Sequence, residues 1–171
     1  VHISNIGHWL SLDFMMNNNY APHQEGFNCS SNPLYLGADL YIDDSKVTEI
    51  TIPEGVTEVK DNALIMYKSL TELTIPSTVT RIGKNAFFEC SNLETVEFSE
   101  GLEEIDDYAF YNCYHITPPD SDNIETGEKA FEGCFGILTF PALPIDLYPS
   151  KTDFHHNIFI QNYLGNECGY T

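Results

Sequence analysis

The sequence has few positive charges. Its 171 residues include 7 Lys and Arg against 26 Asp and Glu, which gives a formal net charge of −19. A surface of that sign repels phosphate backbones and anionic lipid headgroups, so we expect no binding to nucleic acid or to a membrane surface. The charge either keeps an extended surface soluble or steers a basic partner towards it.

Long apolar runs are missing too. No stretch reaches the roughly 18 consecutive apolar residues that a membrane helix needs, so we expect no membrane insertion. The first residues, VHISNIGHWLSLDF, lack the basic start and the continuous apolar run of a secretory signal peptide. Hydrophobic residues still make up 42% of the chain, which is ordinary for a folded domain.

Metal-binding motifs are scarce as well. The five cysteines include no C-x-x-C pair, so no zinc site is predicted. The one histidine pair, His155-His156, would point to opposite faces of a strand and suits a surface loop. No acidic cluster matches the calcium-binding loop D-x-D/N-x-D/N-G, although weak calcium binding at Asp120 and Asp122 remains an alternative to a solvated turn.

What the sequence does contain is an internal repeat of 23 residues. Its copies read VTEITIPEGVTEVKDNALIMYKS at 47–69, LTELTIPSTVTRIGKNAFFECSN at 70–92, LETVEFSEGLEEIDDYAFYNCYH at 93–115 and, two residues shorter, ITPPDSDNIETGEKAFEGCFG at 116–136. Aligned, the copies give apolar columns. Three of the columns are Ala63, Ala86, Ala109 and Ala130; Leu64, Phe87, Phe110 and Phe131; and Tyr67, Cys90, Cys113 and Cys134.

Each copy predicts one coil of a solenoid. In LTELTI the apolar residues alternate with Thr and Glu, which indicates a short strand with one buried face. Pro53 and Pro76 directly after this run end the strand and turn the chain. A second short extended run follows, and KNAFFEC predicts one helical turn. Because one unit cannot bury its apolar edge alone, we expect a right-handed β/α solenoid of parallel strands stacked about 4.8 Å apart.

The stacked coils also bear on the chemistry of the chain. The cysteine column would place one thiol per coil on a buried ladder. Cys29 and Cys168 lie outside the column, and a disulfide between them remains an alternative to free thiols. No nucleophile elbow, phosphate loop or dinucleotide fingerprint occurs. Paired carboxylates on a regular strand surface would lack a closed pocket for glycoside hydrolysis, so we expect no enzymatic activity and no cofactor.

The repeat pattern L-x-x-I/L-x-I-P-x-x-V-x-x-I-G-x-x-A-F-x-x-C-x-x-L, matched best by residues 70–93, resembles the BspA-like, or Treponema-type, leucine-rich repeat. The resemblance implies a leucine-rich-repeat-like fold in a bacterial cell-surface or secreted protein, and adhesion to host or microbial proteins. Two copies depart from the pattern. The first has Leu64 for Phe and Tyr67 for Cys, and in the fourth Pro118 and Pro119 interrupt the strand.

The resemblance divides the chain into three parts. Residues 1–46 are similar to an insertion in which a short helix with a Trp leads to a β-hairpin, whose arms we place at 40–42 and 47–50. Residues 47–136 hold four repeats, and 137–171 form a degenerate cap or tail. Val1 and Ile3 have the spacing of inward strand residues, so we expect the chain either to be a piece of a longer repeat array or to have an unusually blunt start.

The outward strand positions are the candidate ligand face. They are Glu49, Thr51, Glu72, Thr74, Thr95 and Glu97. The second extended run adds Thr57, Glu58, Thr80, Arg81, Glu103 and Glu104. Stacking would make these positions a flat surface, which suits a large partner. We therefore predict an extracellular or cell-surface domain that binds a protein, such as host extracellular matrix or another surface protein.

Two other functions remain open. A carbohydrate-binding module, for mucin glycans for instance, needs exposed rings for stacking. The places to look for them are Trp9, Tyr35, Tyr41 and the C-terminal tyrosines. The other possibility is an architectural spacer without a ligand of its own.

Overall fold

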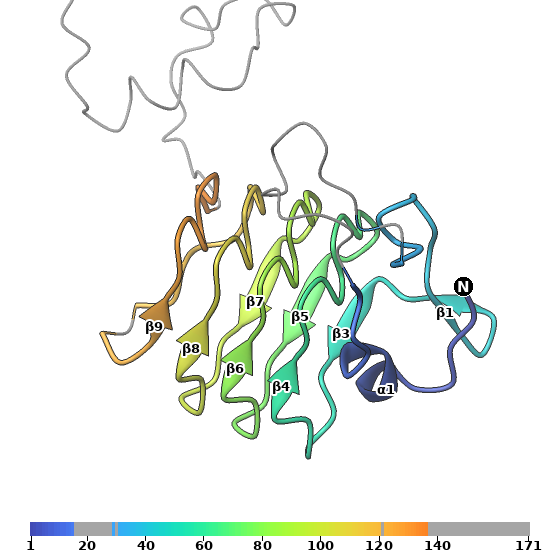
Figure 1. Ribbon diagram of the computed structural model, residues 1–171, viewed down its shortest axis with the longest axis horizontal. Coiled ribbons are helices and arrows are strands. Elements are labelled where there is room, and N and C mark those ends of the chain that lie inside the picture. Colours follow the sequence, from blue (N-terminus) through green and yellow to red (C-terminus); the bar gives the residue numbers. More distant parts are fainter. Residues whose placement is uncertain (16–28, 30, 121, 137–171) are drawn as a thin grey trace, which may run out of the picture. The chain divides into compact units, whose positions relative to one another are not determined.

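The computed structural model describes residues 1–15, 29, 31–120 and 122–136, all of which belong to one compact unit, Val1–Leu138. Consecutive coils lie side by side and form a parallel β-solenoid (Figure 1). The predicted cap at 137–171, with His155, His156 and Cys168, lies outside the described residues. The solenoid confirms the fold that the repeat predicts.

The strands of the solenoid form two parallel sheets. The elements are α1 (Ile6–Leu10), β1 (Tyr41–Ile42), β2 (Ser45–Lys46), β3 (Glu49–Thr51), β4 (Glu58–Val59), β5 (Glu72–Thr74), β6 (Arg81–Ile82), β7 (Thr95–Glu97), β8 (Glu104–Ile105) and β9 (Glu125–Thr126). The first strands of the coils make the sheet β3-β5-β7, and the second strands make the sheet β4-β6-β8-β9. Ile50, Leu73 and Val96 pair in line, so the 23-residue period of the sequence is also the register of the sheet.

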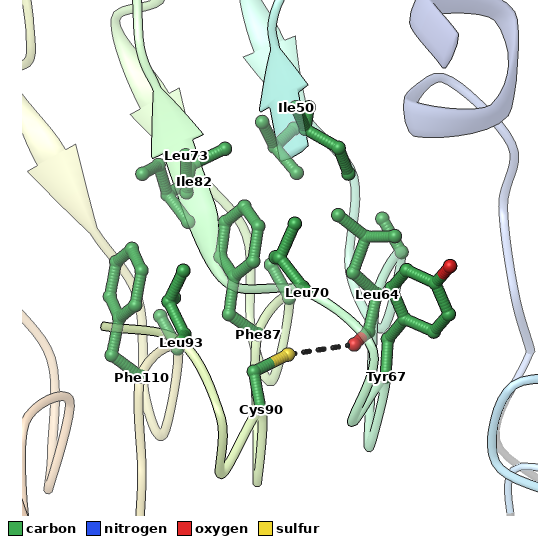
Figure 2. Close-up of a cluster of buried hydrophobic side chains, with 14 of the residues drawn as sticks. Ile50, Leu64, Tyr67, Leu70, Leu73, Ile82, Phe87, Cys90, Leu93 and Phe110 are labelled. Carbon is green, nitrogen blue, oxygen red and sulfur yellow. Dashed lines mark hydrogen bonds between the residues drawn. The ribbon is translucent and has the colours of Figure 1, made fainter. Parts of the chain in front are cut away.

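The aligned apolar columns fill the core. Phe87, Phe110 and Phe131 stack almost in parallel, with ring centroids 4.9 and 5.3 Å apart and interplanar angles of 7° and 3°. Figure 2 shows Leu64 continuing this row in the first repeat, beside Phe87. Phe98 packs edge-on against both Phe110 and Phe131. Like residues therefore lie on like residues, as the alignment of the copies predicts.

The predicted helical turn of each coil is wrong. Residues 61–66, 84–89 and 107–112 form hydrogen-bonded turns, and α1 is the sole α-helix in the described part of the chain. Amides of these turns alternate between two kinds of partner. The Leu64 amide donates to Ala86 of the next coil at 2.7 Å and the Phe87 amide to Ala109 at 2.8 Å, whereas the Phe88 amide donates within its own turn to Asn85 at 3.2 Å. The turns therefore stack in the same way as the sheets.

The N-terminal region contains the predicted helix and hairpin. The side chain of Asn5 caps α1, and Trp9 is buried with its indole N–H donating to the Ala63 carbonyl at 2.8 Å. In the hairpin β1–β2, Asp43 and Asp44 both have positive φ, which is the geometry of a two-residue type I′ turn. This tight turn makes Ser45–Lys46 the second arm, so our placement of that arm at 47–50 was wrong.

The first three residues continue the stack beyond the hairpin. His2 forms a parallel bridge with Tyr41, whose amide donates to the Val1 carbonyl at 2.8 Å. Ile3 packs against the core as its spacing predicts, whereas Val1 is 40% exposed. Only one of the two residues predicted to point inward therefore does so.

The fourth repeat contributes to only one of the two sheets. Strand β9 pairs with β8 and extends the second sheet, with Thr126 beside Ile105. The first sheet ends at β7, and the segment with Pro118 and Pro119 forms no strand. This confirms the predicted interruption, because proline has no amide hydrogen for a ladder.

Candidate binding face

All six predicted ligand-face residues come together on one surface. The register sets Glu49, Glu72 and Thr95 in one row, and Thr51, Thr74 and Glu97 in the next. Thr74 is half-buried and the other five are exposed. The residues between the two rows point inward, as the alternation of a strand requires. We call these six residues the Thr/Glu face.

The glutamates of the Thr/Glu face keep their charge uncompensated. Within the described ranges, no Lys or Arg forms an ion pair with Glu49, Glu72 or Glu97, and the Thr74 hydroxyl donates to Glu97 Oε2 at 3.4 Å. Five cations of the described part of the chain pair elsewhere. Those pairs are Lys46 with Asp39, Lys60 and Arg81 with Glu58, Arg81 with Asp61, Glu104 and Asp106, Lys84 with Asp107, and Lys129 with Glu132.

The second sheet is organised around Arg81. Its guanidinium donates to Glu58 of the preceding coil and to Asp106 of the following coil. It also lies 3.6 Å from Asp61 and 3.4 Å from Glu104. One cation therefore ties three coils together, which gives this sheet a structural network that the Thr/Glu face lacks.

The pKa values of Arg81 and Asp106 both shift upward, for different physical reasons. Burial lowers the pKa of Arg81, but attraction to Asp106, Glu58 and Asp61 outweighs it and raises the pKa overall. The pKa of Asp106 is also raised, first by burial and then by repulsion from Glu104 and Asp61, in spite of Arg81. Both partners of this ion pair thus shift upward, Asp106 mainly because it is partly buried and Arg81 because the carboxylates around it outweigh its burial.

The sequence identified Arg81 as an outward residue but missed its role. Its partners come from neighbouring coils, so only the stacked register brings them together. The sequence also missed two exposed rings, Tyr114 at 42% and Phe135 at 37%, which lie in adjacent coils joined by a hydrogen bond from the Phe135 amide to the Tyr114 carbonyl. These two aromatic residues are more exposed than Trp9, which was one of the rings considered for stacking on a sugar.

The cysteine column is a buried ladder. The thiols of Cys90, Cys113 and Cys134 donate to the carbonyls of Leu64, Phe87 and Phe110 at 3.1 to 3.2 Å, and Figure 2 shows the first of these bonds. Burial raises the pKa of Cys90 and of Cys134 to about 12 and that of Cys113 well above its ordinary value. The ladder is therefore structural.

The remaining candidate groups show no assembled site. Cys29 is a buried free thiol, and its suggested partner, Cys168, lies outside the described residues. Asp120 and Asp122 are exposed. Where the structure describes the chain, no three His, Cys, Asp or Glu side chains are grouped to hold a metal ion. No helix in that part has both the length and the apolar character to cross a bilayer.

Comparison with known proteins supports the repeat assignment. The model of the BspA-type leucine-rich repeat region matches residues 23–138 with six copies. A search of curated proteins found no match. A solved leucine-rich repeat protein from T. pallidum is 32% identical over 51% of this chain, with a TM-score of 0.45; the match covers 44% of that protein's chain. A leucine-rich repeat protein from Bacteroides capillosus is 30% identical, with 52% of this chain and 71% of that one covered and a TM-score of 0.43.

Proposed function

Because this chain belongs to the BspA-type leucine-rich repeat family, we propose that it is a non-catalytic adhesion domain that binds another protein at the bacterial surface or outside the cell. We assign the binding role to the repeats at 47–136 and regard 1–46 and 137–171 as flanking segments. A flat repeat surface offers contact area without a deep pocket, which suits a macromolecular partner.

The Thr/Glu face carries this proposal. Its three glutamates are exposed and are not neutralised by Lys or Arg of the described part of the chain, whereas Glu58 and Glu104 of the second sheet are engaged with Arg81. Uncompensated charge steers a partner of opposite sign and sets the orientation of docking. We therefore propose a partner with a basic surface, such as a host extracellular matrix protein or another cell-surface protein.

The test is binding of the immobilised chain to purified extracellular matrix proteins. A triple variant, Glu49→Lys with Glu72→Lys and Glu97→Lys, reverses the charge of the Thr/Glu face. A matched control changes three exposed glutamates outside the face, Glu54→Lys with Glu100→Lys and Glu103→Lys. We expect the face variant to bind at least about tenfold more weakly than the control. Equal losses in the two variants would refute the assignment of the face.

Carbohydrate binding and a purely architectural role are the competing functions. Trp9 is 5% exposed and is engaged with Ala63, while Tyr35 and Tyr41 are half-buried. These rings offer little surface for stacking on a sugar. A glycan array probed with the same sample separates the three functions, because a spacer would bind neither glycans nor matrix proteins.

A further inference from the structure

The first sheet ends one strand earlier than the second, and this leaves an edge at β7. One repeat beyond Thr95 and Val96 the chain has Pro118 and Pro119, neither of which has an amide hydrogen. Val96 is half-buried, whereas its equivalents Ile50 and Leu73 are 3% and 1% exposed. The edge of β7 is therefore less covered than the strands before it.

The backbone of β7 has hydrogen-bonding groups on this edge. The Thr95 amide donates to Thr71 and the Glu97 carbonyl accepts from Ile75, so both groups point towards the preceding coil. Successive residues of a strand point their N–H and C=O groups to opposite sides. The N–H and C=O of Val96 consequently face the outer edge, where no described residue forms a strand with β7.

The side chains around this edge specify what would fit it. Val96 and Phe98 are half-buried apolar residues on the inward side, and they favour an apolar residue opposite them. Glu94 and Glu97 are exposed beside them and favour Lys or Arg. A second copy of this chain fits poorly, because it would bring the same glutamates and a further net charge of −19.

We propose that the outer edge of β7 takes up an extended, basic segment of the partner protein as an additional strand. The backbone of that segment pairs with Val96, an apolar side chain of the segment packs over Val96 and Phe98, and a flanking Lys or Arg lies beside Glu97. This inference rests on the proposed function and adds to it the mode of binding and the chemistry of the partner.

The first test uses peptides and leaves the protein unchanged. The probe is a short, acetylated and amidated peptide of alternating lysine and valine, measured by fluorescence anisotropy against the full chain. One control peptide carries glutamate in place of lysine, and another carries an N-methyl group on its central residue, which removes a backbone donor. We expect both controls to bind at least about tenfold more weakly. Equal binding of the N-methylated peptide would overturn strand addition.

The second test uses variants of the edge. Val96→Pro removes the outward amide hydrogen while the bonds of Thr95 and Glu97 to the preceding coil remain, and Val96→Thr is the matched control that keeps the amide. Thermal unfolding shows whether each variant folds. If Val96→Pro does not fold, the N-methylated peptide still tests strand addition on the unmodified chain. We expect Val96→Pro to abolish binding of the lysine–valine peptide and Val96→Thr to retain it.

A third comparison separates this inference from the proposed function. Glu97→Lys changes the charge at the edge, whereas Glu49→Lys changes the same face two strands away on β3. Strand addition predicts that Glu97→Lys weakens peptide binding about tenfold and Glu49→Lys much less. Equal effects of the two substitutions on peptide binding would overturn strand addition at β7 and leave the Thr/Glu face as the binding surface. Self-association of the unmodified chain that Val96→Pro abolishes would overturn the basic partner in favour of a second copy.

Discussion

Phe87 and Phe110 lie face to face in successive coils, with ring centroids 4.9 Å apart and an interplanar angle of 7°. Both rings are fully buried, and Phe131 continues the row. Each ring therefore covers the apolar face of its neighbour, which a single repeat cannot do for itself. The stability of the solenoid depends on this column more than on any exposed position.

Phe110→Ala tests the column. Removal of a buried ring costs about 3–5 kcal/mol, because the cavity between Phe87 and Phe131 can collapse only in part. Phe110→Leu, which copies the Leu64 of the first repeat, is expected to cost less than about 2 kcal/mol. Denaturation with urea measures both, with Glu103→Ala as the exposed control. Equal unfolding midpoints for Phe110→Ala and Glu103→Ala would refute the stacked core.

Arg81→Gln tests the network of the second sheet. The change leaves Glu58, Asp106 and their neighbouring carboxylates without the cation that joins three coils. The Arg81 side chain is 30% exposed, so we expect a loss of about 1–2 kcal/mol, below the 3–5 kcal/mol of a fully buried pair. Lys84→Gln, which removes one exposed pair, is expected to cost less than about 1 kcal/mol.

The Arg81→Gln loss should also depend on conditions. Added salt screens the repulsion among the remaining carboxylates, and low pH protonates them, so both should narrow the gap to the unmodified chain. Urea denaturation at two salt concentrations measures this. A loss that does not respond to salt or to pH would show that Arg81 acts through packing of its aliphatic stem and not through its charge.

The sequence predicted the strands and the core because its period reports them directly. Ile50 and Leu73 are spaced by one repeat and pair in register, so alignment of the copies is equivalent to stacking of the coils. The turns were mispredicted because KNAFFEC has helix-forming residues, whereas in the structure Asn85 and Glu89 take positive φ. Amides in that conformation reach the next coil, and a propensity for local hydrogen bonds does not report on such a partner.

The sequence was enough to predict which residues form the Thr/Glu face, but not which of the acidic residues in the repeats are neutralised by a cation. Alternation alone places Glu72 and Thr74 outward. Which acids are neutralised depends on pairs between coils, such as Arg81 with Asp106, that are 25 residues apart in the sequence. The end of the first sheet at β7 was predictable from Pro118 and Pro119, but the direction of the hydrogen-bonding groups of β7 needed the register of the strands.

Asp107→Asn tests the acid response of the stack. A hydrogen bond from the Glu128 amide, followed by the contact with Lys84, lowers the pKa of Asp107 against a smaller opposing effect of burial. A lowered folded-state pKa contributes stability above the unfolded value of about 3.9, and this stability is lost as the pH falls through the lowered pKa. The asparagine variant keeps an acceptor for Glu128 but does not titrate, so the stability advantage of the unmodified chain should shrink below about pH 4.

Asp106→Asn is the matched contrast, because the folded-state pKa of Asp106 is raised. Protonation then favours the folded state, so the unmodified chain should gain stability relative to this variant as the pH falls through the raised pKa. Urea denaturation across the acid range measures both variants. Parallel pH dependences for Asp106→Asn and Asp107→Asn would contradict the opposite signs of the two shifts.

Alkylation of the cysteine ladder tests its burial. With pKa values of about 12, the thiolate fraction of Cys90 and Cys134 at pH 8 is on the order of 10⁻⁴, and burial also blocks the reagent. We expect iodoacetamide to modify the native ladder far more slowly than the chain unfolded in urea. Cys134, which is only half-buried, should react before Cys90 and Cys113, as read by mass spectrometry of the peptides. Native labelling of Cys113 at the unfolded rate would mean that its thiol is not held against the Phe87 carbonyl, and the stacking of the coils at that level would have to be abandoned.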